Sequence, residues 1–262
     1  MKLISASLLA ASAMADKWTK LGDTWNSLST SNGVSEDDRK IIDLFTISSV
    51  ANYGCWCRFN QYKPYKGTPQ DTVDTACKQW YQNTECLNMD YSTDTPAYQC
   101  NDAVEYTDVI ASLQDPFDDA TDYAAACAAA NAGDDCAIGA CHVDAVFIRQ
   151  VFTFLSENTL NMTLSGWYGF NGNVCTGFVP STGTTVAPVE PTTGANLPTT
   201  AASGTTVTPV PNKECCGAYP DRFPYKTAGG DRQCCVDTTF NVNVLECCPS
   251  GPTSILSVIG TC

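Results

Sequence analysis

The chain contains very little histidine and, over a long stretch, very little positive charge. His142 is the only histidine in 262 residues, and residues 79–179 carry fourteen acidic side chains but a single basic one, Arg149. The lack of Cys-x-x-Cys pairs and of accompanying histidines argues against a zinc site. The formal net charge of -14 argues against a nucleic-acid partner, because phosphates are bound by clustered lysines and arginines.

Long apolar runs are missing beyond the first residues. Met1-Lys2, the apolar residues 3–13 and the small-residue pattern Ala13-Met14-Ala15 are the three parts of a secretory signal peptide, and the run is too short to span a bilayer. We therefore expect a signal peptide over residues 1–15, a mature chain from Asp16, and secretion to the extracellular space. We expect no transmembrane segment later in the chain and no lipid anchor at its end.

Sixteen cysteines in a secreted chain predict a disulfide framework. Residues 179–212 consist mainly of Thr, Pro, Ala, Val and Gly, with Glu190 as the only charge, and we expect them to form an extended stalk suited to O-glycosylation. This linker separates a first domain, residues 16–178, from a Cys-rich module, residues 213–262. The module is too small to be stable without crosslinks.

The first domain is expected to be mainly α-helical. Ser35 is a typical N-cap with acidic residues in the following turn, and the third predicted helix has apolar residues at helical spacing. A fourth helix is expected from alanine content. The predicted helices run from Ser35 to Phe45, from Asp71 to about Cys86, from Asp135 or Cys136 through Leu155, and over residues 120–132.

Two segments resemble the calcium loop and the first catalytic helix of secreted phospholipase A2. They are residues 53–57 (YGCWC) and residues 67–81 (GTPQDTVDTACKQWY). The resemblance implies a mainly α fold in which disulfides staple two long antiparallel helices. In that family the helix reads Cys-Cys-x-x-His-Asp, with His as general base and Asp as calcium ligand. The matching positions here are Ala76, Cys77, Trp80 and Tyr81.

The two substitutions remove the chemistry that the resemblance implies. An indole has no basic nitrogen free to accept a proton, and a phenol is a poor calcium ligand beside a carboxylate. The family's loop Cys-Gly-x-Gly-Gly becomes Cys57-Arg58-Phe59-Asn60-Gln61, in which Arg58 would repel calcium. His142 lies two positions before Asp144, a spacing that points the two side chains to different faces of a helix. We therefore predict no catalytic residues.

The segment Cys136-x4-Cys141-His142-Val143-Asp144 resembles the second catalytic helix of the family, with Asp144 retained. We expect the Trp80 indole to donate a hydrogen bond to Asp144 from a core position. Two family bridges would lack both cysteines, at Val143 with Asn83 and at Ala76 with Gln150. The bridges that the resemblance implies are Cys57–Cys77, Cys55–Cys175, Cys127–Cys141, and Cys136 with either Cys86 or Cys100.

The terminal module has paired cysteines, Cys215-Cys216, Cys234-Cys235 and Cys247-Cys248, followed by Cys262. The pattern is similar to the repeats of galaxin, a matrix protein of coral skeletons. Adjacent cysteines rarely bridge each other, so each pair is expected to reach other pairs. Nine cysteines in the first domain and seven here allow a bridge between the domains or a disulfide-linked oligomer. Residues 219–225 are expected to form a compact loop packed on disulfides.

Three functions remain open. The first is a non-catalytic extracellular matrix or interaction protein, as in the phospholipase A2-like otoconins, whose partners would be matrix proteins or a mineral surface. Its acidic stretch could gather calcium weakly, although the same charge also serves solubility. The alternatives are an active calcium-dependent phospholipase A2 and a lipid-binding decoy with an apolar channel near residues 41–45. The weak candidates for calcium binding are Asp115, Asp118, Asp119 and Asp122. Separately, Asn161 is the candidate site of N-glycosylation.

Overall fold

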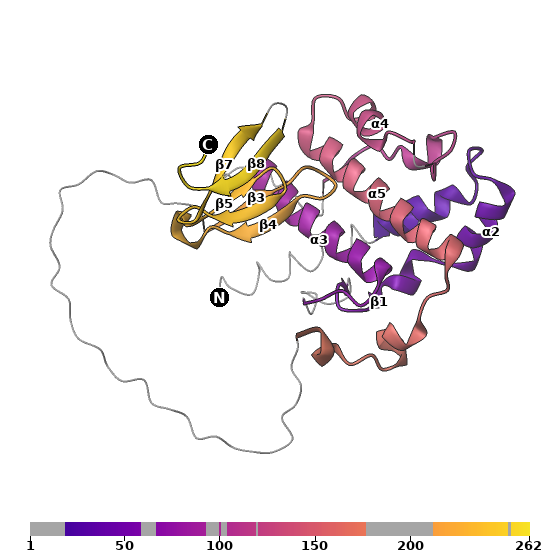
Figure 1. Cartoon of the computed structure of the whole chain (residues 1–262). Helices are drawn as coiled ribbons and strands as arrows, with labels where there is room; N and C mark the ends of the chain where they lie inside the picture. Colours follow the sequence, from indigo (N-terminus) through magenta and orange to yellow (C-terminus); the bar gives the residue numbers. More distant parts are fainter. Residues whose placement is uncertain are drawn as a thin grey trace, which may run out of the picture.

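The computed structural model describes residues 19–58, 67–92, 100, 104–118, 120–176, 212–250 and 253–262. The expected signal peptide and almost all of the linker lie outside these residues and stay predictions. The described chain forms a helical domain, residues 19–176, followed by three β-hairpins at one end of its longest helices (Figure 1). We call these hairpins, residues 212–262, the terminal module.

Four capped helices build most of the helical domain, together with the helical residues 19–28. Each begins directly after a residue whose side chain accepts a backbone N–H three positions later: Ser35, Asp71, Asp122 and Asp134. The predicted helices are therefore present, although the second continues beyond Cys86. The helices are α2 (Glu36–Leu44), α3 (Thr72–Tyr91), α4 (Tyr123–Ala130) and α5 (Asp135–Glu157). The 3₁₀ turns are η1 (Ile47–Val50), η2 (Ile110–Ser112), η3 (Met162–Leu164), η4 (Gly166–Tyr168) and η5 (Gly172–Thr176).

Helices α3 and α5 run antiparallel, side by side (Figure 1). Gln150 Nε2 donates to Gln79 Oε1 at 3.0 Å near one end of the pair. Near the other end, Leu87 lies over Gly139, where an added Cβ would sit 2.3 Å from the Leu87 Cδ2 atom. Glycine at this position therefore allows the two helices to approach closely. The core between α3, α5 and the surrounding helices includes the fully buried Trp25, Leu28, Phe147, Ile148 and Val151.

Helix α5 corrects one expectation. By length and composition it is apolar enough to cross a membrane, whereas the sequence was expected to have no such segment after the leader. In the structure, 67% of that apolar stretch is buried within the protein. Its apolar residues are therefore explained by packing in the core of the helical domain.

A buried carboxylate fixes the loop before α3. Asp74 accepts hydrogen bonds from the backbone N–H groups of Cys55, Trp56 and Gln70 at 2.7 to 2.9 Å. Burial raises the pKa of Asp74, and the three N–H donors oppose that change. Gly54 has φ 56°, and a Cβ there would lie 2.3 Å from the Asp74 Cγ atom. The short strands β1 (Asn52–Tyr53) and β2 (Cys57–Arg58) are thereby held against α3.

The terminal module contains three antiparallel hairpins in sequence order. Each hairpin starts with a strand that carries a cysteine pair, and each forms a separate two-stranded sheet. A 3₁₀ turn, η6 (Ala228–Gly230), precedes the second hairpin. The strands are β3 (Lys213–Cys216) with β4 (Phe223–Lys226), β5 (Arg232–Cys235) with β6 (Thr238–Asn241), and β7 (Leu245–Ser250) with β8 (Thr253–Val258).

All sixteen cysteines are paired within the chain. Cys136 pairs with Cys100, and Cys86 pairs with Cys215 of the terminal module. In the module, the second cysteine of each pair is bridged to the first cysteine of the next pair, and the series ends at Cys262. The remaining bridges are Cys55–Cys175, Cys57–Cys77 and Cys127–Cys141, which are pairs that the resemblance implies.

Candidate functional site

Trp80 on α3 and Asp144 on α5 face each other inside the helical domain. The Trp80 Nε1 atom donates to the Asp144 Oδ1 atom at 2.6 Å, which confirms the predicted contact. The two residues are only 3% and 2% exposed. The hydroxyl of Tyr106 donates to the other carboxylate oxygen, Oδ2. Both oxygens of Asp144 are therefore hydrogen-bonded, as a buried carboxylate requires.

Tyr106 is held in its protonated, donating form. Burial and the neighbouring Asp144 raise the pKa of Tyr106 well above its usual value. The Lys20 ammonium lies 3.6 Å from the centre of the Tyr106 ring and donates to the Tyr106 backbone carbonyl at 3.2 Å. No local sequence pattern singles out Tyr106, because it comes from an irregular segment between α3 and α4. Only folding brings this residue to Asp144.

Aromatic packing fills the space beside Asp144. The Trp80 ring meets the Tyr81 ring edge-on, with centroids 5.2 Å apart, and lies 5.9 Å from the Phe147 ring. The Trp80 indole can only donate a hydrogen bond, and Tyr81 beside it carries a phenol. Trp80 and Asp144 are thus hydrogen-bonded residues of the core.

His142 and Asp144 have different surroundings on α5. His142 lies half-buried on α5, and burial lowers its pKa, with Asp122 at the start of α4 opposing the change. Asp144 instead faces α3 through its contact with Trp80. The two side chains of the His142-Val143-Asp144 segment thus have different neighbours, as the spacing predicted.

The structure describes only some of the residues on which the calcium predictions depend. Residues 59–61 and the side chain of Arg58 lie outside the described residues, so the altered calcium loop stays a prediction. Asp119 lies outside them too. The exposed Asp118 accepts a hydrogen bond from the Ala120 N–H at 2.8 Å, and Asp122 caps α4. Asp115 is exposed on the same segment, and its backbone carbonyl accepts from the Thr121 hydroxyl.

Within the described ranges, one group of acidic and sulfur side chains has ligand atoms close enough together for a metal ion: Glu246, Cys248 and Cys262. The two cysteines are bridged to each other, so their sulfur atoms are not thiolate ligands. Glu246 Oε1 accepts the backbone N–H groups of Thr261 and Cys262 at 2.9 Å each. This group therefore fastens the end of the chain.

Gln150 and Asn83, two positions where the resemblance implies no bridge, make polar contacts. Gln150 is hydrogen-bonded to Gln79 one turn after Ala76. Asn83, 2% exposed, donates to the backbone carbonyls of Gln79 and Pro220 and accepts from the backbone N–H of Arg222. Asn83 thus joins α3 to the terminal module.

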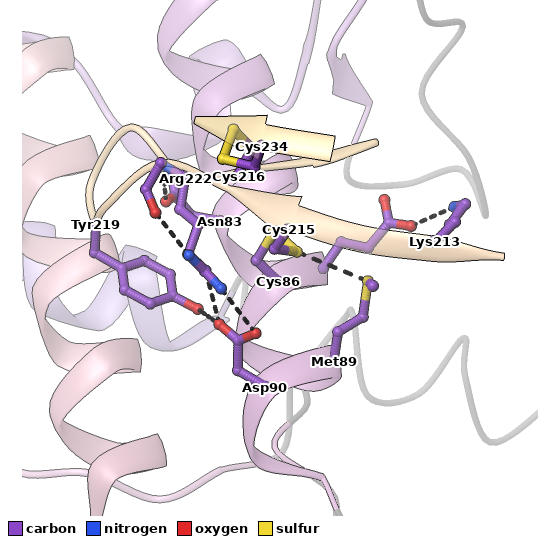
Figure 2. Close-up of a disulfide and its surroundings, with 12 residues drawn as sticks. Asn83, Cys86, Met89, Asp90, Lys213, Cys215, Cys216, Tyr219, Arg222 and Cys234 are labelled. Atoms are coloured by element: carbon purple, nitrogen blue, oxygen red, sulfur yellow. Dashed lines mark hydrogen bonds and ion pairs between the residues drawn. A yellow bond between two sulfur atoms is a disulfide. The ribbon is translucent and has the colours of Figure 1, made fainter. Parts of the chain in front are cut away.

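We call this side of α3, comprising Gln79, Asn83, Cys86 and Asp90, the docking face. Figure 2 shows that it receives the loop before β4, residues 219–222, together with β3. The Cys86–Cys215 bridge crosses the contact, with a Cα–Cα distance of 5.8 Å. Residues 219–225 were expected to form one compact loop, but Phe223–Tyr225 belong to β4, and only residues 219–222 form the loop that contacts α3.

Asp90 is the polar centre of the docking face. Arg222 binds its carboxylate with two nitrogens, Nε at 2.8 Å and Nη2 at 3.1 Å, and the Tyr219 hydroxyl donates to it at 3.0 Å (Figure 2). Burial and the charge of Asp90 raise the pKa of Tyr219, so the phenol remains a donor. Each side chain of the Arg222–Asp90 pair is 25% exposed, so solvent screens it less than a surface pair. At the ends of the contact, Lys213 pairs with Glu85 and Gln79 donates to Asp221.

No family model, curated protein or solved structure matches the chain. The function is therefore argued from the two features above, the aromatic core at Asp144 and the docking face of α3.

Proposed function

We propose that the protein is a secreted, non-catalytic phospholipase A2-like protein that acts as an extracellular matrix or interaction protein. The observation that carries this proposal is the hydrogen bond from Trp80 to Asp144. Hydrolysis of a phospholipid ester by the family's mechanism needs a base that deprotonates water and a carboxylate-bound calcium ion that stabilises the oxyanion. Trp80 and Tyr81 supply neither group.

The disulfides support a single joined unit for this role. Cys175 is bridged to Cys55 and Cys215 to Cys86, so both ends of the linker are tied covalently to the helical domain. The expectation of an extended stalk over residues 179–212 stays a prediction, because almost all of these residues lie outside the described ranges. Cutting the linker would release no fragment unless the disulfides were also reduced.

The acidic surface supports weak, distributed calcium or mineral binding. Residues 79–179 carry fourteen acids and one base, and the described carboxylates of Asp115, Asp118 and Asp122 belong to exposed residues. Separate exposed carboxylates hold calcium weakly, since a tight site needs six to eight oxygens in one cage.

Lipid capture is the second candidate, favoured by one observation. The adjacent Trp167 and Tyr168 are 69% and 70% exposed, in a described segment, residues 158–176, that has no charged residue. Exposed tryptophan and tyrosine are suited to a membrane interface, because one end of each ring system is apolar and the other polar.

The first test combines calcium calorimetry with a hydrolysis assay on phosphatidylcholine vesicles. We expect weak, multiple calcium sites and no hydrolysis above the blank, with an active secreted phospholipase A2 as positive control. A single tight calcium site together with hydrolysis that Asp144→Asn abolishes would refute the proposal. Vesicle sedimentation that Trp167→Ala abolishes, without hydrolysis, would favour the lipid-capture alternative.

The structural role of Trp80 can be tested separately. Trp80→Phe keeps an aromatic ring but removes the donor to Asp144, so it should lower the free energy of unfolding by about 1–3 kcal/mol. Trp167→Phe is the matched control and should leave stability unchanged, because that side chain is exposed. Urea unfolding monitored by circular dichroism measures both. Equal stability of the two variants would mean that the Trp80 hydrogen bond contributes nothing.

A further inference from the structure

The last hairpin of the terminal module has an open strand edge. Among the described residues, β8 is hydrogen-bonded to one strand, β7, and its other edge has no paired strand, although β5 also lies close to β8. The N–H of Ile259 donates to the Val244 carbonyl, so these two residues form a hydrogen-bonded pair of the antiparallel ladder. Hydrogen-bonded and non-hydrogen-bonded pairs alternate along such a ladder, so the N–H and C=O groups of Ser254 and Leu256 point away from β7. Pro249 on β7 is the partner of Ser254, so its backbone nitrogen likewise points away from β8, toward the outer edge of β7. Proline cannot donate a hydrogen bond, so β7 is the blocked edge and β8 the open one.

This edge lacks the usual protection against pairing with another strand. Natural sheet edges are commonly guarded by charged side chains. Residues 238–262 contain a single charged side chain, Glu246, and its carboxylate is bound to the backbone of Thr261 and Cys262. The hairpin also exposes large apolar side chains. They are Val244, Ile255, Val258 and Ile259.

From these observations we infer that β8 pairs with β8 of a second copy of this chain. The pairing would be antiparallel about a two-fold axis, giving a four-stranded sheet and a closed dimer. All sixteen cysteines are already paired, so the association is non-covalent.

The distribution of charge favours a second copy that meets at this hairpin. The chain carries a net charge of -14, so two copies repel each other where their acidic domains approach. Residues 212–262 carry five acids and four bases, and the charge of the last hairpin is confined to Glu246. The hairpin is thus a place where two such chains can meet with little repulsion. The inference does not depend on the loss of catalytic residues.

The size and charge of this surface indicate a weak dimer. One strand pair and a few apolar side chains fall at the low end of interface sizes, where complexes are transient. The remaining repulsion between two acidic chains is screened by salt. We therefore expect the dimer to strengthen as the salt concentration rises, opposite to an association held by ion pairs.

Sedimentation velocity of the full secreted chain, over a roughly thousandfold concentration range up to about 1 mM, tests the inference. Val258→Lys places a charge on the edge strand, and Ser254→Pro gives β8 the block that Pro249 gives β7. Each should weaken dimerisation at least about tenfold, since each removes a specific contact of the pairing. Val236→Lys is the matched control, because Val236 is 60% exposed and Val258 62%, but Val236 lies between β5 and β6.

The expected result is a concentration-dependent dimer that Val236→Lys retains and Val258→Lys loses. A wild-type chain that stays monomeric at every concentration would overturn the inference and leave the edge to a different partner. Equal weakening of the dimer by Val236→Lys and Val258→Lys would also overturn the inference, because the added charge would then act regardless of its position. If Ser254→Pro disrupts the hairpin by circular dichroism, Val258→Lys alone decides.

Discussion

The helical domain and the terminal module are stabilised by different means. The helical domain buries a large cluster in which Trp25, Leu87, Phe147 and Ile148 are almost fully enclosed. In the described part of the module, the buried apolar residues are Cys216, Tyr225, Cys235, Phe240 and Cys248, so three of the five are bridged cysteines. A segment of this size buries too little surface to offset the loss of chain entropy. We therefore expect a disulfide to be essential in the module and supplementary in the helical domain.

Removing one bridge from each region should give the largest contrast. Cys235→Ser with Cys247→Ser opens a bridge of sequence separation 12, and Cys127→Ser with Cys141→Ser opens one of separation 14. Each loss costs about 2–4 kcal/mol, a range that exceeds what the small core of the module can absorb. We expect the first variant to unfold the module and the second to leave both regions folded, with a lower midpoint.

Limited proteolysis and amide hydrogen exchange distinguish these outcomes region by region. Exchange protection lost in residues 232–258 but kept in α3 and α5 is the expected pattern for the first variant. If both variants instead unfold cooperatively as one, the two regions are not stabilised differently and the comparison fails.

The docking face joins the two regions, and its central ion pair should have an intermediate effect. Arg222→Ala removes two charge-assisted hydrogen bonds and leaves Asp90 partly buried without its cation, which should cost about 1.5–3 kcal/mol. Lys213→Ala is the control, since its pair with Glu85 is more exposed and should be worth at most about 1 kcal/mol. Chemical unfolding measures both. A larger loss for Lys213→Ala would contradict the assigned centre of the contact.

The smallest effect concerns pH and is confined to the helical domain. Burial lowers the pKa of His142 in the folded chain below its pKa in the unfolded chain. At pH values between these two pKa values, the unfolded chain binds more protons than the folded chain. Stability from this group is present above the unfolded pKa and is lost as the pH falls through the folded pKa. Wild type should therefore lose more stability than His142→Gln between about pH 7 and about pH 5.

Urea unfolding of both proteins at the two pH values tests this expectation. Because His142 is the only histidine, the difference between the two curves isolates its contribution. A steeper loss in His142→Gln than in wild type would show that the neighbouring Asp122 outweighs burial and raises the folded pKa.

Local signals predicted the helices and part of the site. Ser35 and Asp71 cap helices where the N-cap pattern placed them, because capping depends on residues within one turn. The facing positions of Trp80 and Asp144 followed from aligning two helix segments with the phospholipase A2 pattern. Helix α3 continues to Tyr91, beyond the predicted end at about Cys86, and no Gly or Pro in residues 87–91 interrupts it.

Contacts between distant segments that the phospholipase A2 resemblance did not cover could not be predicted. Tyr106 reaches Asp144 from an irregular segment, and its sequence neighbours give no periodic pattern that would orient it. Cys86 was considered as a partner of Cys136, whereas it is bridged to Cys215 across 129 residues of chain. Cysteine counts limit the pairings but do not select one, because any two cysteines can meet when folding brings them together.

The sequence by itself determined the composition-dependent properties of this protein: many paired cysteines, an acidic helical domain, capped helices, and the absence of His and Asp at the positions 80 and 81. The tertiary structure decided which side chains satisfy Asp144, which face of α3 carries the terminal module, and which strand edge stays open. The reason is physical. Charge, caps and helical periodicity act over a few residues, whereas burial and pairing depend on which distant surfaces exclude water together.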